Sequence, residues 1–286
     1  MQKKNENPIS AEPSVEDIEQ MDYYDFMGYM EVPFFMVGGL ESSERLAQLC
    51  DIKPNMRVLF IGCGTGESAL NYVRKFDVNV AGIDIAEKMI EEANKRVHQE
   101  GLENKAEFKA GDAYDLDFPD KSFDIVISEF VSQFLDCSRA FPEFHRVLKP
   151  NGRLGINEMF KLDDIPPDAE KTVNEAEQIF RELTNLPFTL YSLEKWKQYF
   201  TDNGFIDLQS EEQLEIGSAI SSREMIHDMG GWKGIFKMLG KMIKLMLKSK
   251  KIRKKFGMIS KAKRRLISNR TTKKYVGYLL LSGRRK

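Results

Sequence analysis

Short apolar runs alternate with amphipathic stretches along the middle of the chain. Runs of strand length occur at 57–61, 78–83, 106–110, 123–128 and 152–157. Between the second and third runs, apolar residues recur at helical spacing, at Met89, Ile90, Ala93 and Val97. This spacing predicts a helix with one buried face. Five short strands separated by helical patterns predict a doubly wound α/β fold, in which a parallel sheet carries helices on both faces.

The rest of the chain contains further helices and two more strands by the same criteria. Helical patterns extend to about Thr184 and over 192–203, and strands are predicted at 205–216 and 275–282. We therefore expect four parts. They are an N-terminal arm and cap segment (1–45), an α/β core (46–216), a basic helical lid or insertion (217–273), and a last strand that returns to the core sheet (274–286).

Polar residues stand at the ends of four predicted strands. Asp84 follows the second strand, Asp112 the third, Ser128 and Glu129 close the fourth, and Glu158 follows the fifth. Because the carboxyl ends of parallel strands share one edge, and ligands of such sheets bind there, these side chains are expected to lie together. The sequence therefore predicts a ligand site at this edge.

The first strand ends in a glycine loop, Gly62-Cys-Gly-Thr-Gly66. Alternate glycines permit a tight turn and a close approach of ligand to backbone, and the helix that follows offers free N–H groups. A dinucleotide-binding loop has a further glycine at its sixth position, which is Glu67 here. Since a carboxylate there repels a pyrophosphate, the loop favours a cofactor without phosphates, and a dehydrogenase is the least favoured interpretation.

Two carboxylates suit a nucleoside at the same edge. Asp84 closes the strand that follows the glycine loop and its helix, and it can accept hydrogen bonds from both hydroxyls of a ribose. Asp112 and Ala113 are placed to bond and cover an adenine ring. Each aspartate, taken alone, also suits the N-cap of a following helix. Their combination with the glycine loop favours the nucleoside.

These segments together resemble the class I S-adenosylmethionine-dependent methyltransferases, and most of all the subgroup of ubiquinone/menaquinone and sterol methyltransferases. The resemblance spans about residues 39–160 and is carried by VLFIGCGTG (58–66), GID (82–84), GDA (111–113), FDIVIS (123–128) and RVLKPNG (146–152). It implies a Rossmann-like, doubly wound sheet of seven strands whose last strand is antiparallel. It also implies S-adenosyl-L-methionine as the cofactor.

The resemblance assigns cofactor contacts to particular residues. The glycines would bound the methionine portion, Asp84 the ribose, and Asp112 with Ala113 the adenine. The full expected set is Gly62, Cys63, Gly64, Gly66, Asp84, Ile85, Asp112, Ala113 and Ser128. The chain departs from the family at Phe60, where an acidic residue usually supports the amino end of the cofactor; Glu67 is a candidate substitute.

Methyl transfer from a sulfonium depends largely on proximity and alignment, and it needs a general base only when the acceptor must lose a proton. The candidate catalytic residues are Glu129, Glu158 and Tyr24. Tyr24 can pack on a cationic amine or orient a hydroxyl group. The other interpretation of Tyr24 is hydrophobic anchoring of the N-terminal segment.

Composition adds limits to this picture. The 286 residues are 42% hydrophobic and 30% charged, which suits a folded core, and no apolar run is long enough to span a bilayer. Three widely spaced cysteines and three histidines form no pattern of disulfides or metal ligands, so no metal is expected. With no apolar leader after the first lysines, a cytoplasmic location is expected.

Charge is distributed very unevenly. From Met229 onward the chain holds 20 of its 43 basic residues and none of its 44 acidic ones. Within this segment, lysines at 233, 237, 241, 244 and 248 recur on one helical face, and Ile235, Leu239, Met242 and Met246 line another. The pattern over residues 232–265 therefore predicts one of two roles. The segment either makes peripheral contact with an anionic membrane surface or forms a lid over the site with solvated lysines.

Other partners of the basic segment are less favoured. Docking on the acidic body of the chain stays open, whereas the aromatic residues lie on the apolar face and give a nucleic acid no stacking platform. The sequence does not indicate an oligomeric state. The favoured function is a methyltransferase for a small, amphiphilic acceptor such as a lipid or quinone. The alternatives are a methyltransferase of a water-soluble amine, thiol or acid, and a cofactor-binding protein without catalysis.

Overall fold

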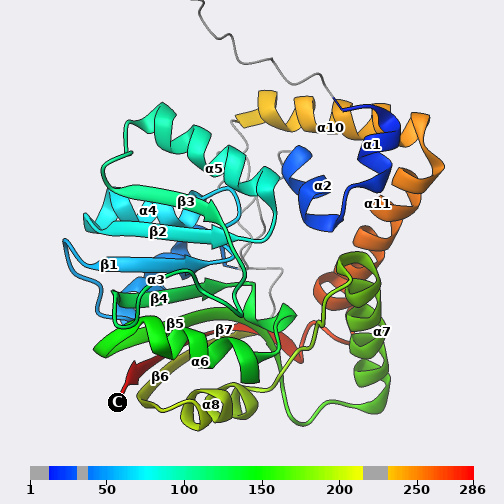
Figure 1. The fold of residues 1–286 in the computed structure, drawn as a ribbon. Coiled ribbons are helices and arrows are strands. Elements are labelled where there is room, and N and C mark those ends of the chain that lie inside the picture. The colour runs from blue at the N-terminus through cyan, green and yellow to red at the C-terminus, as the bar shows by residue number, and fades with distance from the viewer. Residues whose placement is uncertain (1–12, 31–37, 215–230) are drawn as a thin grey trace, which may run out of the picture.

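Figure 1 shows the computed structural model of the chain, which describes residues 13–30, 38–214 and 231–286. Within the predicted arm and cap segment, residues 1–12 and 31–37 lie outside the described residues, and so do 215–230, which include the start of the predicted lid.

A seven-stranded mixed sheet forms the centre of the molecule, in the order β3-β2-β1-β4-β5-β7-β6. The strands are β1 (Arg57–Ile61), β2 (Asn79–Asp84), β3 (Ala106–Ala110), β4 (Phe123–Glu129), β5 (Leu148–Lys161), β6 (Phe205–Leu214) and β7 (Val276–Arg285). The first five pair in parallel, and β7 is antiparallel to β5 and β6. The predicted fold, with its antiparallel last strand, is confirmed.

Helices cover both faces of this sheet. One face carries α3 (Gly39–Leu49), α4 (Glu67–Phe76) and α5 (Glu87–Glu100), and the other carries α6 (Cys137–Val147) and α8 (Leu193–Asp202). The buried side of α5 is the one predicted from its spacing. At the carboxyl edge, α7 (Pro167–Thr184) packs with aromatic residues that follow β4.

Among the described residues, four helices form a cap beyond the carboxyl ends of the parallel strands, as can be followed in Figure 1. They are α1 (Val15–Gln20), α2 (Tyr23–Tyr29), α10 (Gly231–Lys248) and α11 (Lys250–Lys263), and a short π-helical turn (Arg264–Ser268) leads from α11 toward β7. Ile18 and Phe26 of the N-terminal helices share a hydrophobic cluster with Leu245 and Ile252 of the basic helices. Segments that are far apart in sequence are therefore joined in the cap.

The packing face of α10 differs from the predicted one. Met238, Met242 and Leu245 face the cap cluster. Lys241, expected in solvent, lies 3.7 Å from the centre of the Tyr29 ring and donates a hydrogen bond to the Tyr29 carbonyl. Because apolar residues cover more of the circumference of α10 than one packing face needs, the neighbouring helices decide which part is buried.

We expect the C-terminal strand to be essential for stability. Leu281 of β7 is fully buried, so Leu281→Ala should cost about 2–5 kcal/mol of the free energy of unfolding, measured by urea denaturation. The matched control is Leu247→Ala at a position on α10 that is 75% exposed, which should change stability by less than about 0.5 kcal/mol. Equal effects of the two substitutions would contradict the placement of β7 inside the sheet.

Candidate functional site

The glycine loop connects β1 to α4 in a conformation that requires its glycines. Gly62, Gly64 and Gly66 have φ values of 61°, 54° and 80°, in the region that side chains disfavour. A Cβ atom on Gly62 would collide with the methyl groups of Val131. The loop is therefore shaped by close backbone contact with the segment that follows β4.

Asp84 ties this loop to the end of β2. Its Oδ2 atom accepts a hydrogen bond from the Gly64 amide and its Oδ1 atom accepts one from the Ala86 amide, each at 2.9 Å. The side chain is almost completely buried, and this burial raises its pKa above the usual value despite the two amides. These two well-aligned bonds and the nearby Ile85 amide do not use all four lone pairs of the carboxylate, so the group can still accept a hydrogen bond from a ligand hydroxyl.

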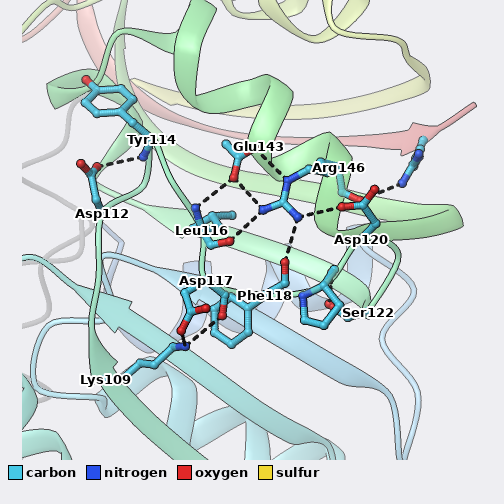
Figure 2. A network of polar contacts seen from close by, with 12 residues as sticks. Lys109, Asp112, Tyr114, Leu116, Asp117, Phe118, Asp120, Ser122, Glu143 and Arg146 are labelled. Atoms are coloured by element: carbon cyan, nitrogen blue, oxygen red, sulfur yellow. Dashed lines mark hydrogen bonds and ion pairs between the residues drawn. The ribbon is translucent and has the colours of Figure 1, made fainter.

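The loop after β3 forms the opposite wall of the site, and side chains of α6 hold this loop in place. Asp112 accepts a hydrogen bond from the Tyr114 amide at 2.9 Å, which fixes the turn at the wall. Figure 2 shows that the Arg146 guanidinium extends from α6 toward this loop and donates to the carbonyls of Leu116 and Phe118. Glu143 pairs with Arg146 and accepts from the Leu116 amide (Figure 2).

A cavity opens between these walls at the carboxyl edge. One part is formed by Asp84, the exposed side chain of Ile85, and the Asp112–Ala113 turn. The other part is apolar, and its walls come from the segment after β4, from Leu186 and from Tyr24 of α2. Residues that line the cavity are Tyr24, Ile61, Gly62, Gly64, Ile83, Asp84, Ile85, Met89, Gly111, Asp112, Ala113, Tyr114, Phe130, Val131, Phe134, Leu135 and Leu186.

Tyr24 is a wall residue whose phenol stays protonated. Burial raises its pKa, and the negative charge of Asp84 raises it further. Its ring contacts Tyr23 and Phe134 edge to face, with centroids 5.3 and 6.3 Å apart. Tyr24 therefore makes hydrophobic contacts and also lines the cavity.

Glu158 supports the wall from behind. It is fully buried, and its Oε1 atom accepts hydrogen bonds from the amides of Val131 and Ser132 at 3.1 and 2.7 Å. Just before these amides, Phe130 has a φ of 61°, which is unusual for a large side chain. Burial raises the pKa of Glu158 to about 8. These contacts give Glu158 a positioning role for the wall.

Glu129 is also buried, but without comparable contacts. Neither of its carboxylate oxygens has a well-aligned hydrogen-bond donor among the described residues. The hydroxyl groups of Ser43 and Ser68 are its polar neighbours and oppose the effect of burial, which raises its pKa to about 7. No lysine or arginine in the described part of the chain forms an ion pair with it.

The predicted cofactor residues fall into two groups. Gly62, Gly64, Asp84, Ile85, Asp112 and Ala113 line the cavity. Three others are not among its described lining residues and lie behind it: the Cys63 amide bonds the Ile83 carbonyl, Gly66 begins α4, and the Ser128 hydroxyl bonds that of Ser132 at 2.7 Å. Their contact with a cofactor stays a prediction, as do the catalytic roles of Glu129, Glu158 and Tyr24.

At position 60, where the family usually has an acidic residue, the Phe60 side chain makes a hydrophobic contact. The Phe60 ring packs edge to face on Tyr72, with centroids 4.9 Å apart. Glu67, the candidate substitute, forms ion pairs with Arg74 and Arg96. Its charge is therefore already neutralised by side chains on α4 and α5, which does not favour the substitute role.

Sequence reasoning missed the apolar wall. Phe130, Phe134, Leu135 and Leu186 have no recognisable motif, and the positive φ of Phe130 cannot be read from the sequence. The available signal was the aromatic run directly after Glu129, at the edge where ligands bind.

The sheet order and the cavity at its carboxyl edge agree with a Rossmann-like methyltransferase fold. Residues 59–156 match a family described as a methyltransferase domain. Over these residues the chain is similar to the class I S-adenosylmethionine-dependent methyltransferases.

Two curated relatives illustrate the range of this similarity. Phosphoethanolamine N-methyltransferase 3 of Arabidopsis thaliana is 28% identical over 194 residues, which cover 67% of this chain and 37% of that protein. A sterol 24-C-methyltransferase of Aspergillus fumigatus is 39% identical over 119 residues, which cover 41% of this chain and 32% of that protein. The matches thus span only about a third of the length of these relatives.

A solved structure shows the same fold over nearly the whole chain. Phosphoethanolamine N-methyltransferase 2 of Haemonchus contortus, determined in complex with S-adenosyl-L-methionine, superposes with a TM-score of 0.64 at 20% identity. The superposition covers 96% of this chain and 60% of that one. At this identity the likeness establishes the fold.

The raised pKa of Glu158 predicts a pH dependence of stability. Between its usual pKa near 4.5 and about 8, the folded state holds a proton that the unfolded state releases, so stability falls as pH rises through this window. Glu158→Gln keeps an oxygen for the two amides and should flatten the fall of the melting temperature between pH 5 and 8. The control is Glu107→Gln, on the exposed side of β3. A variant curve parallel to the wild-type curve would disprove the assignment.

Proposed function

We propose that the protein is an S-adenosyl-L-methionine-dependent methyltransferase whose acceptor is a small amphiphilic molecule. The observation that carries this proposal is the cavity, in which a buried carboxylate with free lone pairs stands next to the glycine loop and continues into an apolar compartment. A polar nucleoside end and an apolar acceptor end are the two parts that such a reaction needs.

The residues present fit the nucleoside portion of the cofactor. Asp84 would accept hydrogen bonds from the ribose hydroxyls, since its own amide donors do not use all four lone pairs of the carboxylate. Ile85 is 65% exposed at this wall, and with Ala113 it offers apolar surface for the two faces of an adenine ring. A ligand bound at this wall would cover the exposed Ile85 side chain.

The chain's own residues would contribute orientation and exclusion of water. When bound, the cofactor supplies a methyl group on a positively charged sulfur, which is activated for in-line displacement. The apolar wall of Phe130, Phe134 and Leu135 keeps water away from an acceptor held beside it. The neutral Tyr24 hydroxyl can orient a polar group of the acceptor by a hydrogen bond.

An exposed apolar stripe on α10 supports an acceptor that resides in a membrane. Trp232, Phe236, Ile243 and Leu247 are each more than half exposed, and their positions i, i+4, i+11 and i+15 align them on one line of the helix. Exposed lysines at 233, 244 and 248 lie beside this line. A row of large apolar side chains flanked by lysines is the arrangement of a helix that lies in the interface of an anionic membrane.

The position of α10 relates this surface to the cavity. Lys241 of α10 holds Tyr29 of α2, and α2 also carries the cavity residue Tyr24. No helix among the described residues is long and apolar enough to cross a bilayer. We therefore propose a peripheral mode of membrane contact, in which each lysine near the surface adds about 1 kcal/mol.

Replacement of Asp84 tests the nucleoside assignment. Asp84→Asn should weaken binding of S-adenosylhomocysteine at least about 100-fold by calorimetry, because two hydrogen bonds to a charged group contribute about 1.5–3 kcal/mol each and about 1.4 kcal/mol is tenfold. Asp117→Asn, at an exposed carboxylate of the next loop that pairs with Lys109, should bind as the wild type does. Melting curves of both variants separate loss of binding from loss of fold. Unchanged affinity in Asp84→Asn argues against this site.

Flotation with vesicles tests the membrane proposal. The triple variant Phe236→Ser, Ile243→Ser and Leu247→Ser should lose at least tenfold in binding to vesicles of mixed phosphatidylcholine and phosphatidylserine, because its apolar stripe is gone while its lysines remain. The control variant Lys95→Gln, on α5, should float as the wild type does. Wild-type protein that stays unbound would exclude membrane docking.

The acceptor class is tested with methyl-labelled cofactor and a whole-cell extract, followed by separation into organic and aqueous phases. Label in the organic phase supports the amphiphilic acceptor. Label confined to the aqueous phase replaces it with the water-soluble alternative, to which the phosphoethanolamine enzymes among the relatives belong by name. Absence of label despite cofactor binding refutes the enzymatic proposal.

A further inference from the structure

The Glu129 side chain lies on the same face of the sheet as Phe60. Glu129 is two residues beyond Ile127, the register partner of Phe60, and is therefore nearer the carboxyl edge. In the parallel pair of β1 and β4, Phe60 stands opposite Ile127 and Ile61 opposite Ser128. Because side chains alternate along a strand, Ile127 and Glu129 point to the same face as Phe60. Phe60 and Ile127 share the hydrophobic cluster beneath α3 and α4, in agreement with this register.

The Glu129 carboxylate also lies beside the helix that follows the glycine loop. Ser68, one of its two polar neighbours, is in the first turn of α4, and Ser43 is on α3. The helix start provides a partial positive charge but no full cation. The carboxylate is thus at the end of the glycine loop that the resemblance assigns to the methionine portion of the cofactor.

The chain provides no cation for this carboxylate within its described residues. Both oxygens are shielded from solvent and lack a well-aligned donor, whereas the neighbouring titratable groups, Tyr72 and Cys50, are themselves neutral. A buried carboxylate without a partner is costly, and such a group commonly awaits a ligand or a proton.

Other carboxylates near this edge are already engaged. Asp84 accepts two backbone amides, Glu158 accepts the amides of Val131 and Ser132, and Glu67 is paired with two arginines. The position where the family usually has its acid is occupied by the Phe60 ring against Tyr72. Among these carboxylates of the described residues, Glu158 has one oxygen without a hydrogen-bond donor, whereas Glu129 lacks a well-aligned donor on both oxygens and lies beside the first turn of α4.

We propose that Glu129 binds the α-ammonium group of the cofactor's amino-acid portion, in place of the acidic residue that Phe60 replaces. The proposal rests on the proposed function, since it concerns the same cofactor. Binding of a cation favours the ionised carboxylate, so a Glu129 that is protonated in the free protein would lose its proton to solvent when the cofactor binds. No covalent bond forms in this step.

The test compares two ligands that share the nucleoside but differ at the amino-acid end. S-adenosylhomocysteine carries the α-ammonium group, whereas 5′-methylthioadenosine lacks the whole amino-acid portion. For Glu129→Gln we expect S-adenosylhomocysteine to bind at least tenfold more weakly and 5′-methylthioadenosine to bind unchanged. The matched control is Glu67→Gln, which should leave both affinities unchanged.

A second readout follows the proton. Calorimetry at pH 6.5 in buffers of different ionisation enthalpy should show release of a fraction of a proton when the wild type binds S-adenosylhomocysteine. Neither 5′-methylthioadenosine nor the Glu129→Gln variant should show it. Melting curves without ligand establish that the variant is folded.

Several outcomes would overturn the proposal. Equal losses for both ligands would make Glu129 a structural residue, and a selective loss in Glu67→Gln would assign the ammonium to Glu67. If Glu129→Gln weakens only the binding of ethanolamine to protein saturated with S-adenosylhomocysteine, Glu129 would be assigned to the acceptor. Failure of the wild type to bind either ligand would refute the proposed function itself, whereas normal binding without an effect of Glu129→Gln refutes only this inference.

Discussion

The site depends on one alignment: adjacent parallel strands end at the same edge, and acidic side chains stand at that edge. Asp84 ends β2 and Glu129 ends β4, while Glu158 lies on β5 next to the register pair of Glu129 and Asn157. Beyond this edge the backbone amides have no strand partner, so side chains must supply their hydrogen-bond acceptors. Asp84 does this for the glycine loop and Glu158 for the segment after β4. The glycine loop and the segment after β4 are thus each held by a buried carboxylate.

Burial of a carboxylate costs free energy, and the cost depends on the hydrogen bonds that the carboxylate accepts. Asp84 has one amide on each oxygen and remains open to the cavity, Glu158 uses one oxygen for two amides, and Glu129 has no well-aligned donor among the described residues. Burial raises the pKa of all three groups, and for Glu129 and Glu158 it reaches about 7 and 8. The stability of the fold does not explain why three buried carboxylates lie together at the carboxyl edge of the sheet. A ligand site does, because perturbed acids gather where function requires them.

The sequence predicted the parts of the molecule that follow local rules. Alternation of strands and helices, the inner face of α5 and the glycine turn are short-range patterns, and the structure has them as expected. The Arg146 network, the turn at Phe130 and the packing face of α10 are not local. Arg146 reaches carbonyls of the loop after β3, and the buried side of α10 is chosen by α1 and α2 from the other end of the described chain. The lack of a well-aligned donor for Glu129 among the described residues was also hidden, since a strand-end carboxylate looks alike in sequence whether or not an amide meets it.

The cap resolves part of the uneven charge of the chain. Glu19 of α1 accepts from Ser249 and pairs with Lys251, and Lys255 donates to the Met21 carbonyl at 2.7 Å, so the basic helices do dock on the N-terminal segment. Most of their lysines and arginines nevertheless point to solvent, beside the apolar stripe of α10. Docking on the chain's own acidic residues therefore accounts for the position of the cap but not for its outer surface. Since α2 carries Tyr24 into the cavity and is itself held by Lys241, a surface that binds α10 would also act on the wall of the site. The membrane contact and the entrance for an amphiphilic acceptor that we propose would then belong to one structural unit.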